Sequence, residues 1–301
     1  MSIFTRFFRH KTHPSSRSRK TYPSAPNARW PFKLPDYLSE VEIRQIQRKA
    51  QRLAQKAPFG WGHTIDFGPF SLEGLLKDSY LQIAGFLDDW VWWPASMEQM
   101  VVADVGCFTG GLSLLMASRG ANKVYAIDEI PENLAQCSFT ARVFEAEAVE
   151  CMECSVYALG ERIPPASLDL ILLSGVIYHL SDMLVGLVAM QTLLKPEGIL
   201  LIESNAVECF QHSYANFGRF FMGMWWQPTA LCIQDMCEFA GLSRPEVRFY
   251  TPVRCLARAI KPKNSRLLFK RGMNWPFSDL QDEVPRTLDP SVMAPAPCDH
   301  E

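Results

Sequence analysis

The residues best suited to holding a ligand form a glycine-rich turn that runs from Asp104 to Gly111. The preceding run, 100–105, is short and apolar, as a buried parallel strand should be. Gly106 lets the chain bend sharply, and Gly110 or Gly111 lets the backbone approach a ligand with no Cβ in the way. The free N–H groups at the start of the helix that follows favour a negatively charged group. The turn is therefore a candidate binding loop for a nucleotide-like ligand.

Asp128 is the second candidate for ligand binding. It ends the next predicted strand, 123–127, and lies 22 residues beyond Gly106. That spacing is close to the roughly 20 residues expected for an acid that binds a ribose, whose two hydroxyls can donate to a carboxylate. The alternative is a surface aspartate that caps the helix beginning at Pro131. Asp104 has a similar alternative as an ordinary turn residue.

Tyr178 and His179 follow the fourth predicted strand, at the sheet edge where open α/β proteins bind ligands. A histidine has an ordinary pKa near ~6.5, so His179 is a candidate base for an acceptor hydroxyl, and Tyr178 is a candidate for orienting the reacting groups. Each has an alternative as a packed side chain that shapes the loop. Three further residues are candidates for substrate binding. His63 has packing against Trp61 as its alternative, and Trp225 could instead belong to the core or an interface. Glu203 is a candidate because it ends the fifth predicted strand.

Alternating strands and helices must position these residues. From residue 100 the pattern predicts an α/β, doubly wound, mainly parallel, Rossmann-like sheet with an N-terminal helical extension. The expected strands are 100–105, 123–127, 148–154, 169–174 and 199–204, with a closing pair at 246–251 and 255–260. The expected helices between them are 111–118, 131–141, 183–194 and 229–240.

Composition divides the chain into four parts. Residues 1–35 are basic, broken by Pro and Ser, and predicted to be a flexible leader. Residues 36–99 are predicted to be a helical extension or lid with helices at 39–56 and 77–92, and 100–261 to be the α/β domain. Residues 262–301 are rich in Pro and polar residues and are predicted to be a loosely ordered tail.

Charge and cysteine content limit the partners and the cellular compartment that the sequence allows. The chain has 30 basic and 32 acidic residues; because 1–35 carry eight Lys or Arg and no acid, the remainder holds 22 and 32. The body therefore has no global attraction for nucleic acid. The nine scattered cysteines indicate free thiols in a reducing compartment, and no metal site is expected because the single C-x-x-C lacks a second pair. No apolar stretch reaches the ~20 residues of a membrane span. We expect a cytoplasmic protein, with an organelle transit peptide at the acid-free start as the alternative.

The loop D-V-G-C-F-T-G resembles the first motif of class I S-adenosylmethionine-dependent methyltransferases, with Phe108 where the middle glycine is common. The resemblance implies that 100–261 is the methyltransferase domain and that S-adenosyl-L-methionine is the cofactor. It implies that Asp104 helps to hold the loop and the methionine amino group, and that adenine lies near the segment after the third strand. A dehydrogenase is a weaker alternative, because its loop needs a glycine at 108. The implied cofactor-binding residues are Asp104, Gly106, Cys107, Phe108, Gly110, Asp128, Ser155, Val156 and Ser174.

A narrower resemblance rests on G-V-I-Y-H-L at 175–180, which is similar to a segment of the tRNA wobble-uridine carboxymethyltransferase family. The segments 194–204 and 224–231, and K-A-P-F at 56–59, look like other parts of that family. Its members transfer a group from carboxylated S-adenosylmethionine to a 5-hydroxyuridine in tRNA. By this resemblance Lys56 is an anion-binding candidate, whereas a solvated helix-end lysine is the default. The family's C-terminal arginine, which binds the extra carboxylate, has no clear match, although Arg254 and Arg258 lie nearby.

These observations predict a methyltransferase that acts on a small-molecule metabolite. A tRNA wobble-uridine (carboxy)methyltransferase is the first alternative, favoured by the basic leader and the family segments and opposed by the acidic body. A noncatalytic scaffold that kept the methyltransferase fold is the second alternative.

Overall fold

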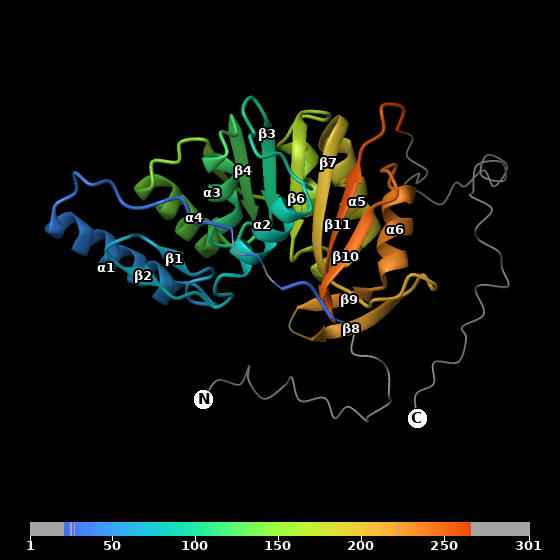
Figure 1. The fold of residues 1–301 in the computed structure, drawn as a ribbon, viewed down its shortest axis with the longest axis horizontal. Coiled ribbons are helices and arrows are strands. Elements are labelled where there is room, and N and C mark those ends of the chain that lie inside the picture. Colours follow the sequence, from blue (N-terminus) through green and yellow to red (C-terminus); the bar gives the residue numbers. More distant parts are fainter. Residues whose placement is uncertain (1–20, 25, 27, 222, 266–301) are drawn as a thin grey trace, which may run out of the picture.

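The structure is a computed structural model that describes residues 21–24, 26, 28–221 and 223–265, and its centre is a seven-stranded sheet with helices on both faces (Figure 1). The strand order is β10-β11-β7-β6-β3-β4-β5. All neighbouring pairs from β7 to β5 are parallel, and β11 is antiparallel to both of its neighbours. The predicted doubly wound, mainly parallel sheet is confirmed. Its strands are β3 (Val101–Val105), β4 (Lys123–Asp128), β5 (Val149–Glu153), β6 (Leu168–Ser174), β7 (Leu194–Asn205), β10 (Glu246–Thr251) and β11 (Arg254–Ile260).

Both faces of the sheet are buried, which explains why its strands read as continuous apolar runs. On one face, alternate residues such as Val102 and Leu172 pack with helix α3 and the N-terminal extension. On the other face, their neighbours Ala103 and Leu173 pack with helices α5 and α6. The flanking helices are α3 (Gly111–Ser118), α4 (Pro131–Val143), α5 (Met183–Leu193) and α6 (Ala230–Phe239), with short 3-10 turns η2 (Val156–Glu161) and η3 (Ile177–His179).

The strand order places a topological switch point between β3 and β6. The chain runs from β3 outward to β4 and β5, and then returns to the other side of β3 to form β6 and β7. Loops on either side of such a point leave the sheet in opposite directions, so a crevice opens at the carboxyl ends of the strands. The glycine-rich loop after β3 and the segment after β6 border this crevice.

The N-terminal extension contains α1 (Glu40–Lys56), a small hairpin of β1 (Ile65–Asp66) and β2 (Ser71–Leu72), and α2 (Ser79–Asp89). Helix α1 begins at Ser39 because a capping box is present: the Ser39 hydroxyl accepts from the Glu42 N–H, and the Glu42 carboxylate accepts from the Ser39 N–H. None of the described helices is long and apolar enough to cross a bilayer.

The prediction of a flexible leader through residue 35 is wrong for its last part. The Ala28 N–H donates to the Leu81 carbonyl at 3.1 Å, and the Trp30 indole donates to the Asp66 carbonyl at 2.8 Å. Leu34 is buried in the core beside α1 and β1. Apolar and aromatic side chains dock this stretch although it has no helical or strand period. Residues 1–20, also assigned to the leader, and 266–301 of the predicted tail lie outside the described residues.

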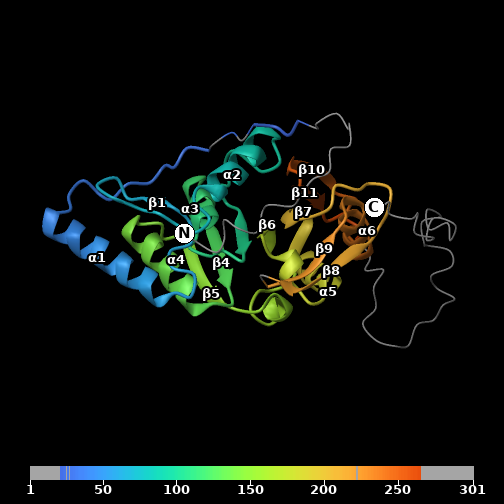
Figure 2. The same ribbon diagram turned by 90° about the horizontal axis from the view of Figure 1, so that it is seen from below.

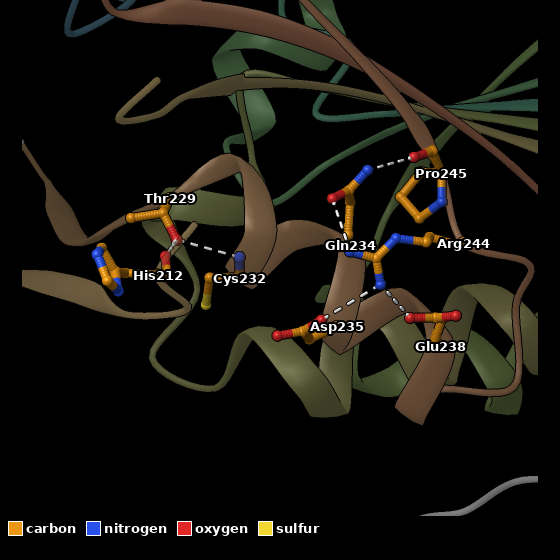
Figure 3. A network of polar contacts seen from close by, with 8 residues as sticks. All are labelled: His212, Thr229, Cys232, Gln234, Asp235, Glu238, Arg244 and Pro245. Carbon is orange, nitrogen blue, oxygen red and sulfur yellow. Dashed lines mark hydrogen bonds and ion pairs between the residues drawn. The ribbon is translucent and has the colours of Figure 1, made fainter. Parts of the chain in front are cut away.

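A two-stranded ribbon, β8 (Ala215–Phe221) and β9 (Met224–Pro228), has no counterpart in the prediction. It lies at the carboxyl end of β7, below the sheet as drawn in Figure 1. Thr229 anchors its base: the hydroxyl accepts from the Cys232 N–H to cap α6 and donates to the His212 carbonyl at 2.8 Å (Figure 3). In the same view Arg244 binds Glu238 at 2.7 Å and so fixes the far end of α6.

Candidate functional site

The glycine-rich loop and Asp128 meet at the ends of β3 and β4. The N–H groups of Gly106 and Cys107 donate to the Ile127 carbonyl at 2.8 and 2.9 Å. The Phe108 N–H donates to the Asp128 carboxylate at 3.0 Å, so the loop and the acid are directly joined. The same carboxylate accepts from the Ile130 N–H at 2.9 Å. Asp128 therefore also holds the residue before α4, but it is not the cap of that helix, because the N-cap position is Ile130 and has no side-chain cap hydrogen bond.

Gly106 and Gly110 have backbone conformations that other residues rarely adopt, with φ of 77° and 79°. A Cβ at Gly106 would lie 2.2 Å from a methyl group of Val176, and one at Gly110 would lie 2.4 Å from the Cys137 sulfur. The loop is thus packed tightly on one side against the segment after β6 and on the other against α4. This close packing sets the width of the crevice.

Phe108 adopts a left-handed conformation, with φ of 54°, at the position where the family commonly has glycine. Its ring turns into the N-terminal extension, where a Cβ on Gly62 would lie 2.3 Å from it. The His63 ring packs edge-on against it, with centroids 5.4 Å apart. The extension therefore supplies the space and the contacts that hold a bulky residue in a glycine-like backbone position.

His63 lies against the same loop. Its N–H donates to the Thr109 hydroxyl at 2.9 Å, and its Nδ1 lies 3.0 Å from that oxygen. The ring is 6% exposed, packs on Tyr80, and burial lowers its pKa to about 4. Trp61, the expected packing partner, packs with Phe67 instead, with ring centroids 6.5 Å apart. His63 is thus a neutral support of the loop rather than a neighbour of Tyr178 and His179.

Asp104 has an unsatisfied oxygen. The Ser113 hydroxyl donates to Oδ2 at 2.6 Å, whereas buried Oδ1 has no hydrogen-bond partner among the described residues. Burial raises the pKa of this carboxyl to about 7. An uncompensated buried acceptor at a binding loop is complementary to a cationic ligand group. The ammonium of a methionine moiety fits this requirement.

The remaining cofactor candidates lie on the same edge of the sheet. The Cys154 N–H donates to the Asp128 backbone carbonyl at 3.2 Å, so Ser155 and buried Val156 follow immediately beside that acid. Ser174 ends β6, and its carbonyl lies 3.6 Å from the position of a Cβ on Gly106. The structure therefore brings the ends of β3, β4, β5 and β6 together, as the strand-end rule predicted.

A second polar group surrounds Tyr178. Arg254, on β11, donates from Nε and Nη2 to the two carboxylate oxygens of Glu203 on β7, and from Nη1 to the Tyr178 hydroxyl at 3.0 Å. The Tyr250 hydroxyl donates to Glu203 at 2.5 Å. Glu203 is only 1% exposed. Its oxygens are already occupied, so Glu203 holds the arginine in place rather than facing a ligand itself.

Arg254 and Tyr250 were not assigned from the sequence. Arg254 is paired with Asn205 in the β11–β7 register, which brings its guanidinium to the end of the parallel strands although β11 runs the other way. Only the strand order provides this information. Residue spacing could therefore suggest an arginine in this part of the chain, but it could not identify the carboxylate that holds it.

His179 is exposed and hydrogen-bonded to the ribbon. Its Nδ1 donates to the Gly223 carbonyl at 2.8 Å, which leaves Nε2 of the neutral ring as an acceptor. Partial desolvation and, to a lesser extent, the charge of Arg254 lower its pKa. A neutral imidazole with a free Nε2 is the form that a general base requires.

The aromatic residues of the ribbon lie beside this histidine. The Trp226 indole donates to the Ser181 carbonyl at 3.0 Å, which ties β9 to the segment after η3. Trp225 lies with its ring centroid 6.2 Å from that of Phe217, which is 55% exposed. The ribbon, whose strands β8 and β9 are labelled in Figure 2, therefore carries partly exposed aromatic side chains, and Trp226 ties it to the segment after η3.

The described cysteines are all free, including Cys151 and Cys154. Cys107 is buried in the loop, and desolvation raises its thiol pKa to about 12, so it is not a nucleophile at neutral pH. Within residues 21–24, 26, 28–221 and 223–265, no group of three or more His, Cys, Asp or Glu is arranged to hold a metal ion.

Comparison with known proteins agrees with this geometry. A family model described as a methyltransferase domain matches residues 96–237. Among solved structures, the [4+2]-cyclase SpnF superimposes with a TM-score of 0.52 at 14% identity, covering 77% of this chain and 98% of the other. A Haemonchus contortus phosphoethanolamine N-methyltransferase 2 superimposes with a TM-score of 0.51 at 17% identity, covering 60% and 52%. These two likenesses show the fold.

Together, the fold, the loop joined to its strand-end carboxylate and the family match identify residues 96–237 as the core of a class I S-adenosylmethionine-dependent methyltransferase. The chain is also similar in sequence to proteins with a more specific name. The chain is 27% identical over 244 residues to a tRNA U34 carboxymethyltransferase of Shewanella woodyi, covering 76% of this chain and 67% of the relative. It is 27% identical over 188 residues to the protein of that name from Helicobacter pylori, covering 60% and 70%.

Proposed function

We propose that S-adenosylmethionine binds at the carboxyl ends of β3 to β6. In this arrangement Asp128 accepts hydrogen bonds from the ribose, and Asp104 receives the methionine ammonium. The glycine-rich loop, including Cys107 and Phe108, covers the methionine side, while Ser155 and Val156 border the adenine and Ser174 closes the crevice. The unsatisfied Oδ1 of Asp104 is the observation that carries this assignment, because a buried acceptor without a protein donor is complementary to a donor group of a ligand.

When bound, the cofactor would supply an electrophilic carbon, that of a methyl or of a carboxymethyl group, attached to its positively charged sulfonium; the S–C bond would break on transfer and its electrons would stay on the sulfur. The protein must align the acceptor's nucleophile behind that group and remove the nucleophile's proton. His179 Nε2 takes the proton from an acceptor hydroxyl, and the imidazolium keeps its Nδ1–H bond to Gly223. Tyr178, held by Arg254, borders the transferred group.

The acceptor that the site supports best is a hydroxylated uridine of RNA. Sequence motifs give no clear match for the C-terminal arginine that binds the cofactor's extra carboxylate in the tRNA wobble-uridine carboxymethyltransferase family, although Arg254 and Arg258 lie nearby. The structure has an arginine, Arg254, with Nη1 on the Tyr178 hydroxyl at 3.0 Å. The Arg254 guanidinium and the Tyr178 hydroxyl together provide donors for a carboxylate. The relatives named above support the same acceptor and a carboxylated cofactor.

A small-molecule acceptor is the second candidate, and the aromatic surface of the ribbon favours it. Phe217 and Trp225 offer flat rings on which a planar metabolite can stack. The acidic balance of residues 36–301 also favours an acceptor other than a polyanion. A noncatalytic scaffold would bind the cofactor and transfer nothing. The described cysteines are free thiols, which supports the proposal that the protein acts in the reducing cytoplasm, whichever acceptor it uses.

Mass spectrometry of transfer products distinguishes these candidates. The full chain is incubated with S-adenosylmethionine or its carboxylated form, in the presence of tRNA or of a tRNA-free metabolite extract. A mass gain on uridine, larger with the carboxylated cofactor, is expected. Tyr178→Phe keeps the ring but removes the hydroxyl, and should reduce the preference for the carboxylated cofactor. Product only in the metabolite extract would establish the second candidate, and cofactor binding without any product would establish the scaffold.

A further inference from the structure

The exposed side of α1 carries a dense cationic surface. Arg48, Lys49, Arg52 and Lys56 are all exposed, and no Asp or Glu occurs between Gln45 and Lys56. These four side chains line a groove of about 450 Å³ together with Gln45 and Leu53. Among the described residues none of the four has an acidic partner within 4.0 Å, whereas Arg44, one turn earlier, is paired with Glu40 at 3.3 Å. We call this surface the α1 groove.

The apolar side of α1 is already occupied, which decides what the groove can bind. Ala50 is fully buried, and Ile43, Ile46 and Leu53 pack against the core formed with the first face of the sheet. A helix that binds a lipid surface must insert its apolar side into the bilayer. Outside this packing α1 leaves only Val41 exposed among its large apolar side chains, at 57%, so its charges are offered without an extended hydrophobic anchor.

The groove is also rigidly held. The Gln136 side chain of α4 donates to the Gly60 carbonyl at 2.8 Å and to the Leu53 carbonyl at 3.4 Å. The ammonium of Lys49 lies 5.7 Å from the ring centroid of Phe139, also on α4. Figure 2 shows α1 lying alongside α4 at the β5 side of the molecule. The helix backbone and the Lys49 side chain are therefore held in place, which lowers part of the ordering cost when an anion binds.

The spacing of the cations suits a chain of phosphates. Arg48, Arg52 and Lys56 repeat every four residues and therefore form one row along the helix, with a length of about 12 Å at ~1.5 Å per residue. One strand of B-form DNA places a phosphate about every 3.4 Å along its axis, and on that scale the row covers roughly three phosphates of a nucleic-acid strand. Lys49 lies beside the row. A compact anion such as free phosphate would engage only one end of it.

The groove leads to the crevice. Lys56 ends α1, and the turn that follows brings Gly62 against Phe108 and the His63 N–H to the Thr109 hydroxyl at 2.9 Å. A strand lying along the groove is thereby directed toward the glycine-rich loop. The α1 groove is a local cluster of positive charge, although residues 36–301 as a whole are acidic.

We propose that the α1 groove binds the phosphate backbone of an RNA strand, independently of base sequence. The choice of RNA rests on the proposed acceptor, whereas binding itself requires no catalysis. Phosphate contacts of this kind position a nucleic acid and leave base recognition to other residues. Here the crevice beyond the groove would receive the base.

The test compares two full-length variants that lose the same charge. R48Q/K49Q/R52Q removes three groove cations and leaves Lys56, which is an anion-binding candidate by the family resemblance. K33Q/R44Q/K263Q removes three exposed cations outside the groove, each of which is paired with an acid. Glutamine keeps helix propensity close to that of arginine and lysine. Binding of a fluorescein-labelled single-stranded RNA and of bulk tRNA is followed by anisotropy between about 50 and 200 mM salt.

We expect the groove variant to bind RNA at least tenfold more weakly than wild type, with the matched control within twofold. The slope of log affinity against log salt should become shallower by about 2, because each phosphate neutralised on a single strand contributes ~0.7 to it. Equal weakening in both variants, or no RNA binding by wild type, would overturn the proposal. Loss of binding to phosphatidylserine vesicles in the groove variant, with RNA binding intact, would overturn it in favour of a membrane.

A separate measurement distinguishes a specific loss of RNA binding from a loss of folding. Binding of S-adenosylmethionine, measured by calorimetry, should be the same in wild type and both variants, which shows that each is folded. If the groove variant loses RNA binding while wild type transfers nothing to RNA, the groove stands and the proposed acceptor fails. If wild type modifies RNA and the groove variant does so with unchanged KM, the acceptor stands and the groove proposal fails.

Discussion

Asp104→Asn should make the ligand-free protein more stable at alkaline pH while it weakens cofactor binding. The wild-type carboxyl has its pKa raised from 3.8 to about 7 by burial, and its Oδ1 lacks a partner among the described residues. Because the folded-state pKa lies above the unfolded value, the folded protein retains the proton to higher pH. Stability is therefore full below about pH 4 and falls as the pH rises toward 7.

The magnitude follows from the two pKa values. Each unit of pKa shift corresponds to about 1.4 kcal/mol, so ionising this buried group costs the wild type about 4 kcal/mol in all. Roughly two of the three units lie above pH 5, so the wild type loses about 3 kcal/mol between pH 5 and pH 8. An amide does not titrate. The free energy of unfolding of Asp104→Asn relative to wild type should therefore rise by about 3 kcal/mol over this interval.

Urea denaturation at about pH 5 and about pH 8 measures this double difference, which cancels any constant cost of placing the amide. Asp36→Asn, at an exposed acid paired with Lys33, is the matched control and should show no such change. In wild type, the cofactor's ammonium should draw the proton off Asp104, so affinity should rise with pH, whereas the variant should bind at least tenfold more weakly. A double difference below about 1 kcal/mol would refute the proposed buried charge.

Four further outcomes are expected. Asp128→Ala should abolish most S-adenosylmethionine binding in calorimetry, and unchanged affinity would remove it from the ribose role. His179→Ala should slow turnover far more than it weakens cofactor binding; in wild type the acidic limb of the pH–rate profile should lie below ~6.5, because the pKa of this base is lowered. Gly62→Ala should cost about 1–3 kcal/mol in denaturation because its Cβ overlaps the Phe108 ring, and Phe108→Ala in the same chain should recover it; no recovery would contradict the packing argument. Arg254→Met should cost about 3–5 kcal/mol, since its carboxylate partner stays buried and unpaired, and a loss under 1 kcal/mol would contradict that pairing.

The sheet and the cofactor edge were predictable because each depends on local signals. Apolar runs such as 169–174 identify buried strands without knowledge of their neighbours. The carboxyl ends of parallel strands share one edge, so Asp128 and Ser155 could be placed near the glycine-rich loop in advance. The hydrogen bond from the Phe108 N–H to Asp128 is a detail that the structure adds to this expected proximity.

The parts that were missed depend on distant partners. The pair of Arg254 and Glu203 exists because β11 inserts antiparallel beside β7, and residue spacing does not reveal strand order. The ribbon β8–β9 contains Gly218 and Arg219, the latter with φ of 52°, so it lacks the alternation of a regular strand. The docked segment around Trp30 has no period at all and is fixed by aromatic contacts.

The contact between Gly62 and Phe108 has an evolutionary consequence. Relatives that have glycine at the position of Phe108 have no ring to accommodate, so they are free to carry a larger residue at the position of Gly62. The two sites should therefore covary across homologues, and a chimera that exchanges one segment without the other should express poorly. A truncated gene product that begins at the first sheet strand would leave the aromatic ring in water, so the extension and the catalytic core must be inherited as one unit.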